Sequence, residues 1–184
     1  NLTLFLKADG SLWATGSNDN GQLGDGTTNS RFTPFLMATQ VRKMAAGSSH
    51  LAFIKYDGTF WVCGSNGAGQ LGDGTSQARP AIFQTNVGIL DLSLGAYSTH
   101  LLQSPPPIIG SQPASSTAFQ GDTITLTVAA HSPLALIYQW YHGTSGDTAQ
   151  PVPGGVAASF TTPPVVAPLG YWVRVSNAVG STDS

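Results

Sequence analysis

The stretch Gly16-Ser-Asn-Asp-Asn-Gly-Gln-Leu-Gly-Asp-Gly-Thr27 recurs as Gly64-Ser-Asn-Gly-Ala-Gly-Gln-Leu-Gly-Asp-Gly-Thr75. The second copy begins 48 residues after the first (64 − 16). The segments upstream align in the same register, Leu4 to Trp13 with Ala52 to Trp61. An internal repeat of this length is typical of solenoids and propellers.

Each repeat contains short apolar runs separated by turn residues. Leu4 to Lys7 and Leu12 to Thr15 are two such runs, and Val41 to Ala45 and Ile89 to Leu94 supply further strands. The Asp9-Gly10 pair predicts a tight hairpin in which both turn positions have positive φ. About four strands in 48 residues predict one propeller blade per repeat.

The repeat resembles that of the regulator of chromosome condensation family, which also includes beta-lactamase inhibitor protein II. The residues that carry the resemblance are Ala46-Gly-Ser-Ser-His-Leu-Ala-Phe53, Asp57-Gly-Thr-Phe-Trp-Val-Cys-Gly-Ser-Asn66 and Gly69-Gln-Leu-Gly-Asp-Gly-Thr75. It covers residues 1–102 and implies a β-propeller. Residues 1–104 hold about two repeats, whereas propellers close with about four to eight blades. We therefore expect a partial propeller of about two four-stranded blades, cut from a longer protein with more blades upstream.

Composition divides the chain in two. Ten of the 12 prolines follow residue 104, and six of the seven Lys and Arg precede it. Pro105-Pro-Pro107 favours an extended linker. Two domains are expected, residues 1–104 and 105–184.

The second domain has the pattern of an immunoglobulin-like β-sandwich. Gly121 to Ala130 alternates apolar residues with threonine, Leu136 to Tyr141 is a second strand, and Tyr171 to Asn177 a third. Trp140 is the expected core tryptophan and Tyr171 the expected corner tyrosine. The positions of the usual inter-sheet disulfide hold two valines, Val128 and Val173, so the sandwich lacks a disulfide.

Residues 105–184 resemble bacterial immunoglobulin-like modules through Tyr138-Gln-Trp-Tyr141, Phe160-Thr-Thr-Pro-Pro164 and Tyr171-Trp-Val-Arg-Val-Ser-Asn-Ala-Val-Gly-Ser181. Such modules occur along secreted and surface proteins. The chain stops where a further strand is expected, so truncation at the C-terminal strand is predicted.

Charge and composition exclude several functional classes. Charged residues make up 9% of the chain, glutamate is absent, and the net charge is −2. Neither a basic nucleic-acid-binding patch nor a membrane-spanning segment is present in the sequence. The fold class is all-β, because glycine, serine and threonine dominate and helix formers are scarce.

Loop residues offer weak candidates for ligand binding. Gly67 to Gly72 matches a dinucleotide-binding glycine pattern, but no helix is predicted after it, so a turn is favoured. Asp19, Asn20, Asp25 and Asp73 could suggest calcium, yet the Asp-x-Asp spacing and the distal glutamate of a calcium loop are missing. No cofactor and no metal are expected.

Histidine, cysteine and tryptophan give no catalytic set. His50 and His100 occupy matching positions if two residues are inserted in the later copy, and a loop-fixing hydrogen bond is favoured over a metal. Cys63 aligns with Thr15 and is expected to be a small buried side chain. Trp13, Trp61, Trp140 and Trp172 could form a sugar-binding platform, although core packing is the more frequent role.

The expected function is non-enzymatic: a protein-binding, adhesive or structural module of a secreted or surface bacterial protein. The partner is a protein bound through a propeller face, carbohydrate is a further candidate, and the ligand-binding residues are unknown. The alternative is a propeller-type regulator of a partner enzyme, either an inhibitor or a guanine-nucleotide exchange factor, because the resembling family contains both.

Overall fold

The computed structural model describes residues 2–184, which are all-β and form two compact units, Asn1–Gln103 (unit 1) and Ser104–Ser184 (unit 2). The division falls at the start of the proline segment. Asn1, the first residue of the predicted first domain, lies outside the described residues. Residues 2–184 include no helix that could cross a bilayer.

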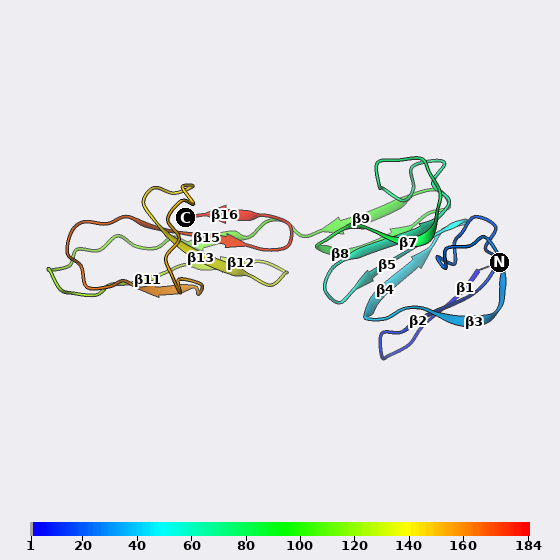
Figure 1. Ribbon diagram of the computed structural model, residues 1–184, viewed down its shortest axis with the longest axis horizontal. Coiled ribbons are helices and arrows are strands. Elements are labelled where there is room, and N and C mark those ends of the chain that lie inside the picture. The colour runs from blue at the N-terminus through cyan, green and yellow to red at the C-terminus, as the bar shows by residue number, and fades with distance from the viewer. Residues whose placement is uncertain (1) are drawn as a thin grey trace. The chain divides into compact units, whose positions relative to one another are not determined.

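Unit 1 consists of three antiparallel sheets that follow one another along the chain (Figure 1). The first contains β1 (Leu2–Leu6), β2 (Leu12–Gly16) and β3 (Arg31–Ala38). The second contains β4 (Val41–Ala46), β5 (His50–Lys55), β6 (Phe60–Gly64) and β7 (Arg79–Asn86). The third contains β8 (Ile89–Leu94) and β9 (Thr99–Gln103). Each strand pairs with its sequence neighbour, as in a propeller blade.

Within residues 2–103 the second sheet alone has four strands, so the prediction of about two four-stranded blades needs correction. The repeat and the blade are out of phase along the chain. A repeat counted from β1 ends inside the next sheet, whose first strand is β4. One four-stranded sheet therefore lies between a three-stranded and a two-stranded one.

The hairpin at Asp9-Gly10 differs from the predicted two-residue turn. Gly10 has φ 80°, but Asp9 does not have positive φ. The Lys7 N–H donates to the Ser11 carbonyl at 3.0 Å, and the Gly10 N–H donates to the Lys7 carbonyl at 3.0 Å. Asp9 Oδ1 accepts from the Ser11 N–H at 2.9 Å, which closes the turn through a side chain. One left-handed glycine is therefore sufficient, and the second repeat has the same arrangement.

Two apolar layers separate the three sheets. The layer between the first and second sheets contains Leu12, Ala14, Leu23, Met37, Val41, Leu51, Phe53 and Cys63. The layer between the second and third contains Ala52, Ile54, Phe60, Val62, Leu71, Ile89 and Leu92. Alternating side chains of β5 enter the two layers in turn, because successive residues of a strand face opposite sides. The second sheet is thus buried on both faces.

Backbone hydrogen bonds join neighbouring sheets at equivalent places. The Val41 N–H donates to the Gly10 carbonyl at 2.9 Å, and the Ile89 N–H donates to the Gly58 carbonyl at 3.1 Å. Donor and acceptor of the second bond each lie one repeat after those of the first. Identical joints at the two boundaries follow from the identical hairpins that supply the carbonyl groups.

Unit 2 is built from seven short strands. They are β10 (Ile108–Ser111), β11 (Thr125–Thr127), β12 (Ala129–His131), β13 (Ile137–His142), β14 (Ser159–Thr161), β15 (Tyr171–Ser176) and β16 (Ser181–Asp183). The pairs β10–β12 and β11–β14 form one side, linked through Val128, and β13–β15–β16 form another sheet. Their core contains Val128, Trp140, Val152, Val173 and Val175.

Of the roles predicted from sequence for unit 2, the core positions are confirmed and the corner tyrosine is not. Trp140 and Val173 are completely buried, and the Trp140 indole N–H donates to the Ala157 carbonyl at 2.8 Å. Tyr171 does not act as a corner tyrosine, since its hydroxyl makes no hydrogen bond to the described chain. Residues 181–183 form the short β16, which pairs with β15, and Asp183 forms an ion pair with Arg174 at 2.7 Å. Truncation at the C-terminal strand stays a prediction.

Candidate functional site

One end of the unit 1 strands carries both long loops, residues 17–30 and 65–78, and the short turns 47–49 and 95–98. We call this end the loop face. An antiparallel meander reverses at alternate ends, so the β4–β5 turn and the β6–β7 loop share one end, and the β5–β6 hairpin lies at the other. Loops displayed by a rigid sheet are the usual place for binding residues.

A buried asparagine holds each long loop together. Asn18 is completely buried, and its Nδ2 donates to Asp25 Oδ1 at 3.2 Å and to the carbonyls of Thr27 at 3.0 Å and Asn29 at 3.1 Å. Its Oδ1 accepts from the Leu23 N–H at 2.8 Å. One side chain thereby satisfies backbone groups on both sides of the loop, which would otherwise be buried without partners.

The second loop repeats this network. Asn66 Nδ2 donates to Asp73 Oδ1 at 2.9 Å and to the Thr75 carbonyl at 3.0 Å, and Asn66 Oδ1 accepts from the Leu71 N–H at 2.9 Å. Sequence reasoning did not single out this asparagine. The available signal was that it stays unchanged while the two residues after it differ between the repeats.

The aspartates considered for calcium are engaged within the protein. Asp25 Oδ2 accepts from Arg31 Nε at 2.6 Å, and Asp73 Oδ2 accepts from Arg79 Nε at 2.8 Å. Asp19 accepts from the Ser17 hydroxyl. Across residues 2–184, no group of three or more His, Cys, Asp or Glu side chains is placed to hold a metal ion. These carboxylates organise loops.

The loop contacts shift the acidity of both paired aspartates. Burial acts to raise the pKa of Asp25, but hydrogen bonds from Arg31 and Thr27 outweigh it and lower the pKa to about 2. Bonds from Thr75 and Arg79 likewise hold the pKa of Asp73 well below its usual range.

An Asp25→Asn variant should lose roughly 1 kcal/mol of unfolding free energy at pH 7, a modest figure because Arg31 is half exposed and solvent screens the pair. The folded pKa of Asp25 lies below its ordinary value of 3.8, so the contribution of its contacts to stability is present above pH 3.8 and disappears as the pH falls toward 2. Urea unfolding followed by circular dichroism at pH 7 and pH 2 measures this. Asp19→Asn is the matched control and should change little. If D25N lost the same unfolding free energy at pH 7 and pH 2, the ionised Asp25 carboxylate would not be the source of the stability.

The glycine pattern at Gly67 to Gly72 forms two successive turns. The Gly69 N–H donates to the Asn66 carbonyl at 2.8 Å, and the Gly72 N–H donates to the Gly69 carbonyl at 3.1 Å. Gly69 and Gly72 have φ 73° and 65°. Turns and bends follow in place of a helix, so the helix N-terminus that a dinucleotide phosphate needs is missing from this segment.

The register of the third sheet corrects the alignment of the short turns. In the β4–β5 pair, Ala46 lies opposite Leu51, and in the β8–β9 pair, Leu94 lies opposite Thr99. Each residue of the second pair lies one full repeat after the corresponding residue of the first pair. The repeat therefore continues through the turn without the predicted insertion.

His50 and His100 consequently do not occupy matching positions. The counterpart of His50 is Ser98, and His100 is the exposed counterpart of the buried Ala52. The His-Leu pair at 50–51 and 100–101 favoured the wrong alignment, because two identical residues outweighed a register that only strand pairing reveals. His50 is fully buried and hydrogen-bonds across the joint to Thr99, as predicted for a structural histidine.

Cys63 and the tryptophans are mainly structural. Cys63 is completely buried and its thiol donates to the Gln22 carbonyl at 3.4 Å, while burial raises the pKa of the thiol well above its usual range. Trp140 and Trp172 are buried in unit 2. Trp13 and Trp61 are half-buried, and each lies under a lysine ammonium group, 4.6 Å from the ring centroid.

Several exposed loop-face positions differ between the repeats, although the central asparagine and its aspartate, threonine and leucine partners recur. Asp19 and Asn20 are replaced by Gly67 and Ala68, all exposed. In the turn 95–98, Tyr97 is 69% exposed. The loop face therefore combines an invariant support with variable, largely uncharged contact positions.

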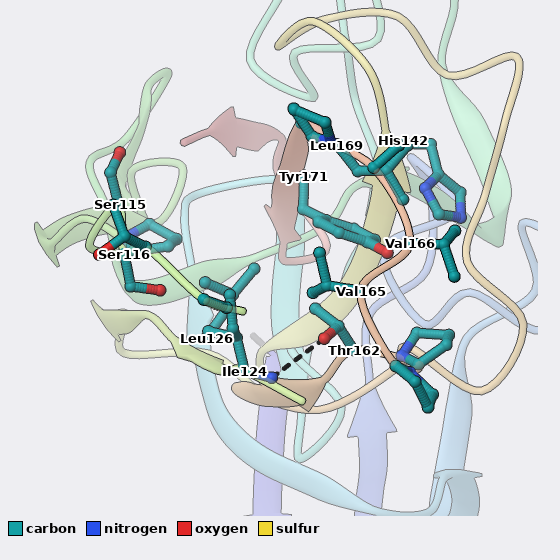
Figure 2. Close-up of a pocket in the computed structure, with 18 of the residues that line it drawn as sticks. Ser115, Ser116, Ile124, Leu126, His142, Thr162, Val165, Val166, Leu169 and Tyr171 are labelled. Carbon is teal, nitrogen blue, oxygen red and sulfur yellow. Dashed lines mark hydrogen bonds between the residues drawn. The ribbon is translucent and has the colours of Figure 1, made fainter. Parts of the chain in front are cut away.

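Unit 2 has a separate hollow of about 750 Å³ (Figure 2). Figure 2 shows Tyr171 and His142 on one wall and Ile124, whose N–H donates to Thr162 Oγ1 at 3.0 Å, on another. Proline-rich segments and aliphatic side chains supply most of the remaining wall. This chemistry offers apolar contact without a convergent set of polar groups.

Comparison with protein families identifies the repeat. Residues 9–54 match the regulator of chromosome condensation (RCC1) repeat, and residues 41–70 match a second model of the same description. Unit 1 carries RCC1 repeats. Over 46 residues, 23% of this chain, it is 48% identical to the E3 ubiquitin-protein ligase HERC2 of Homo sapiens and of Mus musculus. It spans 1% of the length of these ligases.

One solved structure supports the blade arrangement of unit 1. The crystal structure of human WBSCR16 shares the fold with a TM-score of 0.51 and 18% identity, over 56% of this chain and 28% of that one. A crystal structure of Kap60 bound to yeast RCC1 (Prp20) matches with a TM-score of 0.45 and 22% identity at the same coverage. The chain thus spans less than a third of these structures.

Proposed function

We propose that unit 1 belongs to a non-enzymatic β-propeller that binds a protein partner through its loop face. The observation that carries this proposal is the difference between the buried and the exposed residues of the RCC1 repeat. The buried loop residues are the same in both copies, whereas the positions that differ, such as Asp19 and Asn20 against Gly67 and Ala68, are exposed. Variation confined to exposed positions on a rigid scaffold suits partner recognition.

The chemistry of the loop face favours a protein over a nucleic acid. Its two arginines, Arg31 and Arg79, are paired with aspartates, so little free positive charge remains for phosphates. Tyr97 offers the exposed aromatic side chain that often dominates protein interfaces. Carbohydrate is the less favoured ligand, because the tryptophans expected for a sugar platform are buried or covered by lysines.

Unit 2 is proposed to be an immunoglobulin-like spacer of a secreted or surface bacterial protein. What supports this is a tryptophan packed between two antiparallel sheets, with valines at both positions where a disulfide is usual. Fractionation of the source cells, probed with an antibody against residues 104–184, tests the location. Recovery only from the cytoplasm would contradict it.

Selection of phage-displayed peptides on the immobilised full chain tests the binding proposal. Selected peptides should bind at least tenfold more weakly to an Asn20→Ala, Tyr97→Ala double variant, since one aromatic anchor commonly contributes 2 kcal/mol or more. Tyr56→Ala is the control, because Tyr56 is also exposed, at 60%, but lies at the hairpin end of the strands. Failure to enrich peptides, or equal loss in both variants, would overturn the assignment of the loop face.

The alternative is that the propeller regulates a partner enzyme, either as an inhibitor or as an exchange factor. The observation in its favour is the same exposed loop face. Purified chain is expected neither to inhibit a beta-lactamase nor to accelerate nucleotide release from a small GTPase. Dose-dependent activity in one of these assays would favour the regulator.

A further inference from the structure

A buried histidine links the second and third sheets of unit 1. His50 begins β5 and is completely buried, and its Nε2 lies 3.2 Å from the hydroxyl of Thr99, the first residue of β9. The Thr99 hydroxyl donates to the Gln70 carbonyl at 2.7 Å. The chain of bonds therefore runs from the β4–β5 turn of one sheet, through the edge of the next, and back to the long loop.

The direction of these bonds defines the tautomer of His50. The single hydroxyl proton of Thr99 is used on Gln70, so the hydroxyl oxygen must accept from His50. Nε2 therefore carries the proton of the neutral ring. Nδ1 is left as a bare acceptor, and it is buried without a hydrogen-bond partner among residues 2–184.

The surroundings of His50 offer no charge to balance an imidazolium. Gly47 packs against the ring so closely that a Cβ there would overlap Cε1 and Nδ1, and Gly64 lies opposite His50 in β6. Gln70 belongs to the long loop, Ser98 to the turn 95–98 and Thr99 to β9. Every one of these neighbours is uncharged, and no ionic group contributes to the acidity of the ring.

We propose that His50 is a proton-sensitive joint, and that acidification loosens the contact between the β4–β7 sheet and the β8–β9 sheet. A second ring proton must go to Nδ1, which has no hydrogen-bond partner in the closed joint. The proton is accommodated when the joint opens and Nδ1 reaches solvent. The turn 47–49 and the turn 95–98 move apart in that state, so the loop face changes shape in acid.

The pH range follows from the sign of the shift. Burial lowers the pKa of His50 below its ordinary value of 6.5, and the Ser98 backbone offsets this in part. The open joint binds a proton more readily than the closed one. The closed joint is therefore fully stable above pH 6.5 and becomes less stable as the pH falls below this value. For each pH unit, the equilibrium constant for opening increases by at most about tenfold.

Hydrogen exchange of the full chain tests the proposal. After correction for the intrinsic pH dependence of exchange, peptides covering residues 46–55 and 94–103 should become about tenfold less protected between pH 7 and pH 5. Peptides from unit 2 serve as the internal reference. Unchanged protection of 94–103, or a loss shared equally by unit 2, would overturn the proposal.

Two substitutions separate His50 from the other histidines. His50→Gln keeps an amide N–H for Thr99 and cannot titrate. In this variant, the protection of residues 46–55 and 94–103 from hydrogen exchange should not depend on pH. His100→Gln removes an exposed histidine and should respond as the unsubstituted chain does. An equal pH response in H50Q would exclude His50 as the cause.

Nitrogen NMR of the ¹⁵N-histidine-labelled chain gives a readout that needs no variant. His50 should appear as the neutral Nε2–H form, with a pKa below the ordinary histidine value of 6.5. A His50 pKa at or above 6.5, or an Nδ1–H tautomer, contradicts the joint even if H50Q fails to fold.

Discussion

Gly21→Ala should destabilise unit 1 by about 3 kcal/mol or more, whereas the same change at Gly69 should cost about 1–2 kcal/mol. The two glycines are equivalent in the repeat and share φ 73°. Backbone strain is therefore the same at both. A Cβ on Gly21 would overlap Pro80 Cα and lie 2.7 Å from Pro80 Cβ, whereas a Cβ on Gly69 meets nothing within 4 Å.

The difference arises from the neighbouring blade. The loop of the first repeat pairs with β7, since the Gly26 N–H donates to the Pro80 carbonyl at 2.9 Å and the Ile82 N–H donates to the Gly24 carbonyl at 3.2 Å. The overlap at Gly21 is with backbone, which cannot rotate away as a side chain can. The matched pair thus isolates the cost of a close approach between blades from the cost of positive φ.

Cys63 provides the measurement. It is the single cysteine of the chain, it is completely buried, and it lies in the layer between the first two sheets. Its reaction with a thiol reagent at increasing urea concentration reports unfolding of unit 1 without interference from unit 2. Equal midpoints for G21A and G69A would refute the close approach.

Asn18→Asp should also cost about 3 kcal/mol or more, although the two side chains have almost the same shape. The Nδ2 group donates to Asp25 Oδ1 at 3.2 Å and to two carbonyl groups. A carboxylate at this place turns every one of these contacts into oxygen facing oxygen, next to an Asp25 that is ionised at neutral pH. The charge would be completely buried without a partner.

Asn66→Asp should show a similar loss, because its network lies within its own loop and does not need the neighbouring blade. Asn20→Asp adds the same charge two residues from Asn18 at an exposed position and should change the urea midpoint little. Reactivity of Cys63 in urea is again the measurement. Loss in N20D as large as in N18D would show that net charge, and not the buried network, is responsible.

Sequence periodicity predicted the short strands of unit 1 well. The strands expected at 41–45 and 89–94 are β4 and β8, and Cys63 is buried as its alignment with Thr15 indicated. These predictions succeeded because alternation and repeat position depend on residues near in sequence. The hairpin geometry was predicted less well. The Asp9 side chain closes the turn by accepting from the Ser11 N–H, so only Gly10 needs a positive φ.

The sequence alone determined the repeat, the all-β class and the buried character of its cysteine and core tryptophan, since each follows from local pattern. Only the tertiary structure decided that His50 corresponds to Ser98, that two equivalent glycines have different surroundings, and that a buried asparagine organises each loop. Strand register and contacts between blades join residues far apart in the chain. A repeat makes such residues identical in sequence, and packing against neighbours makes them physically different.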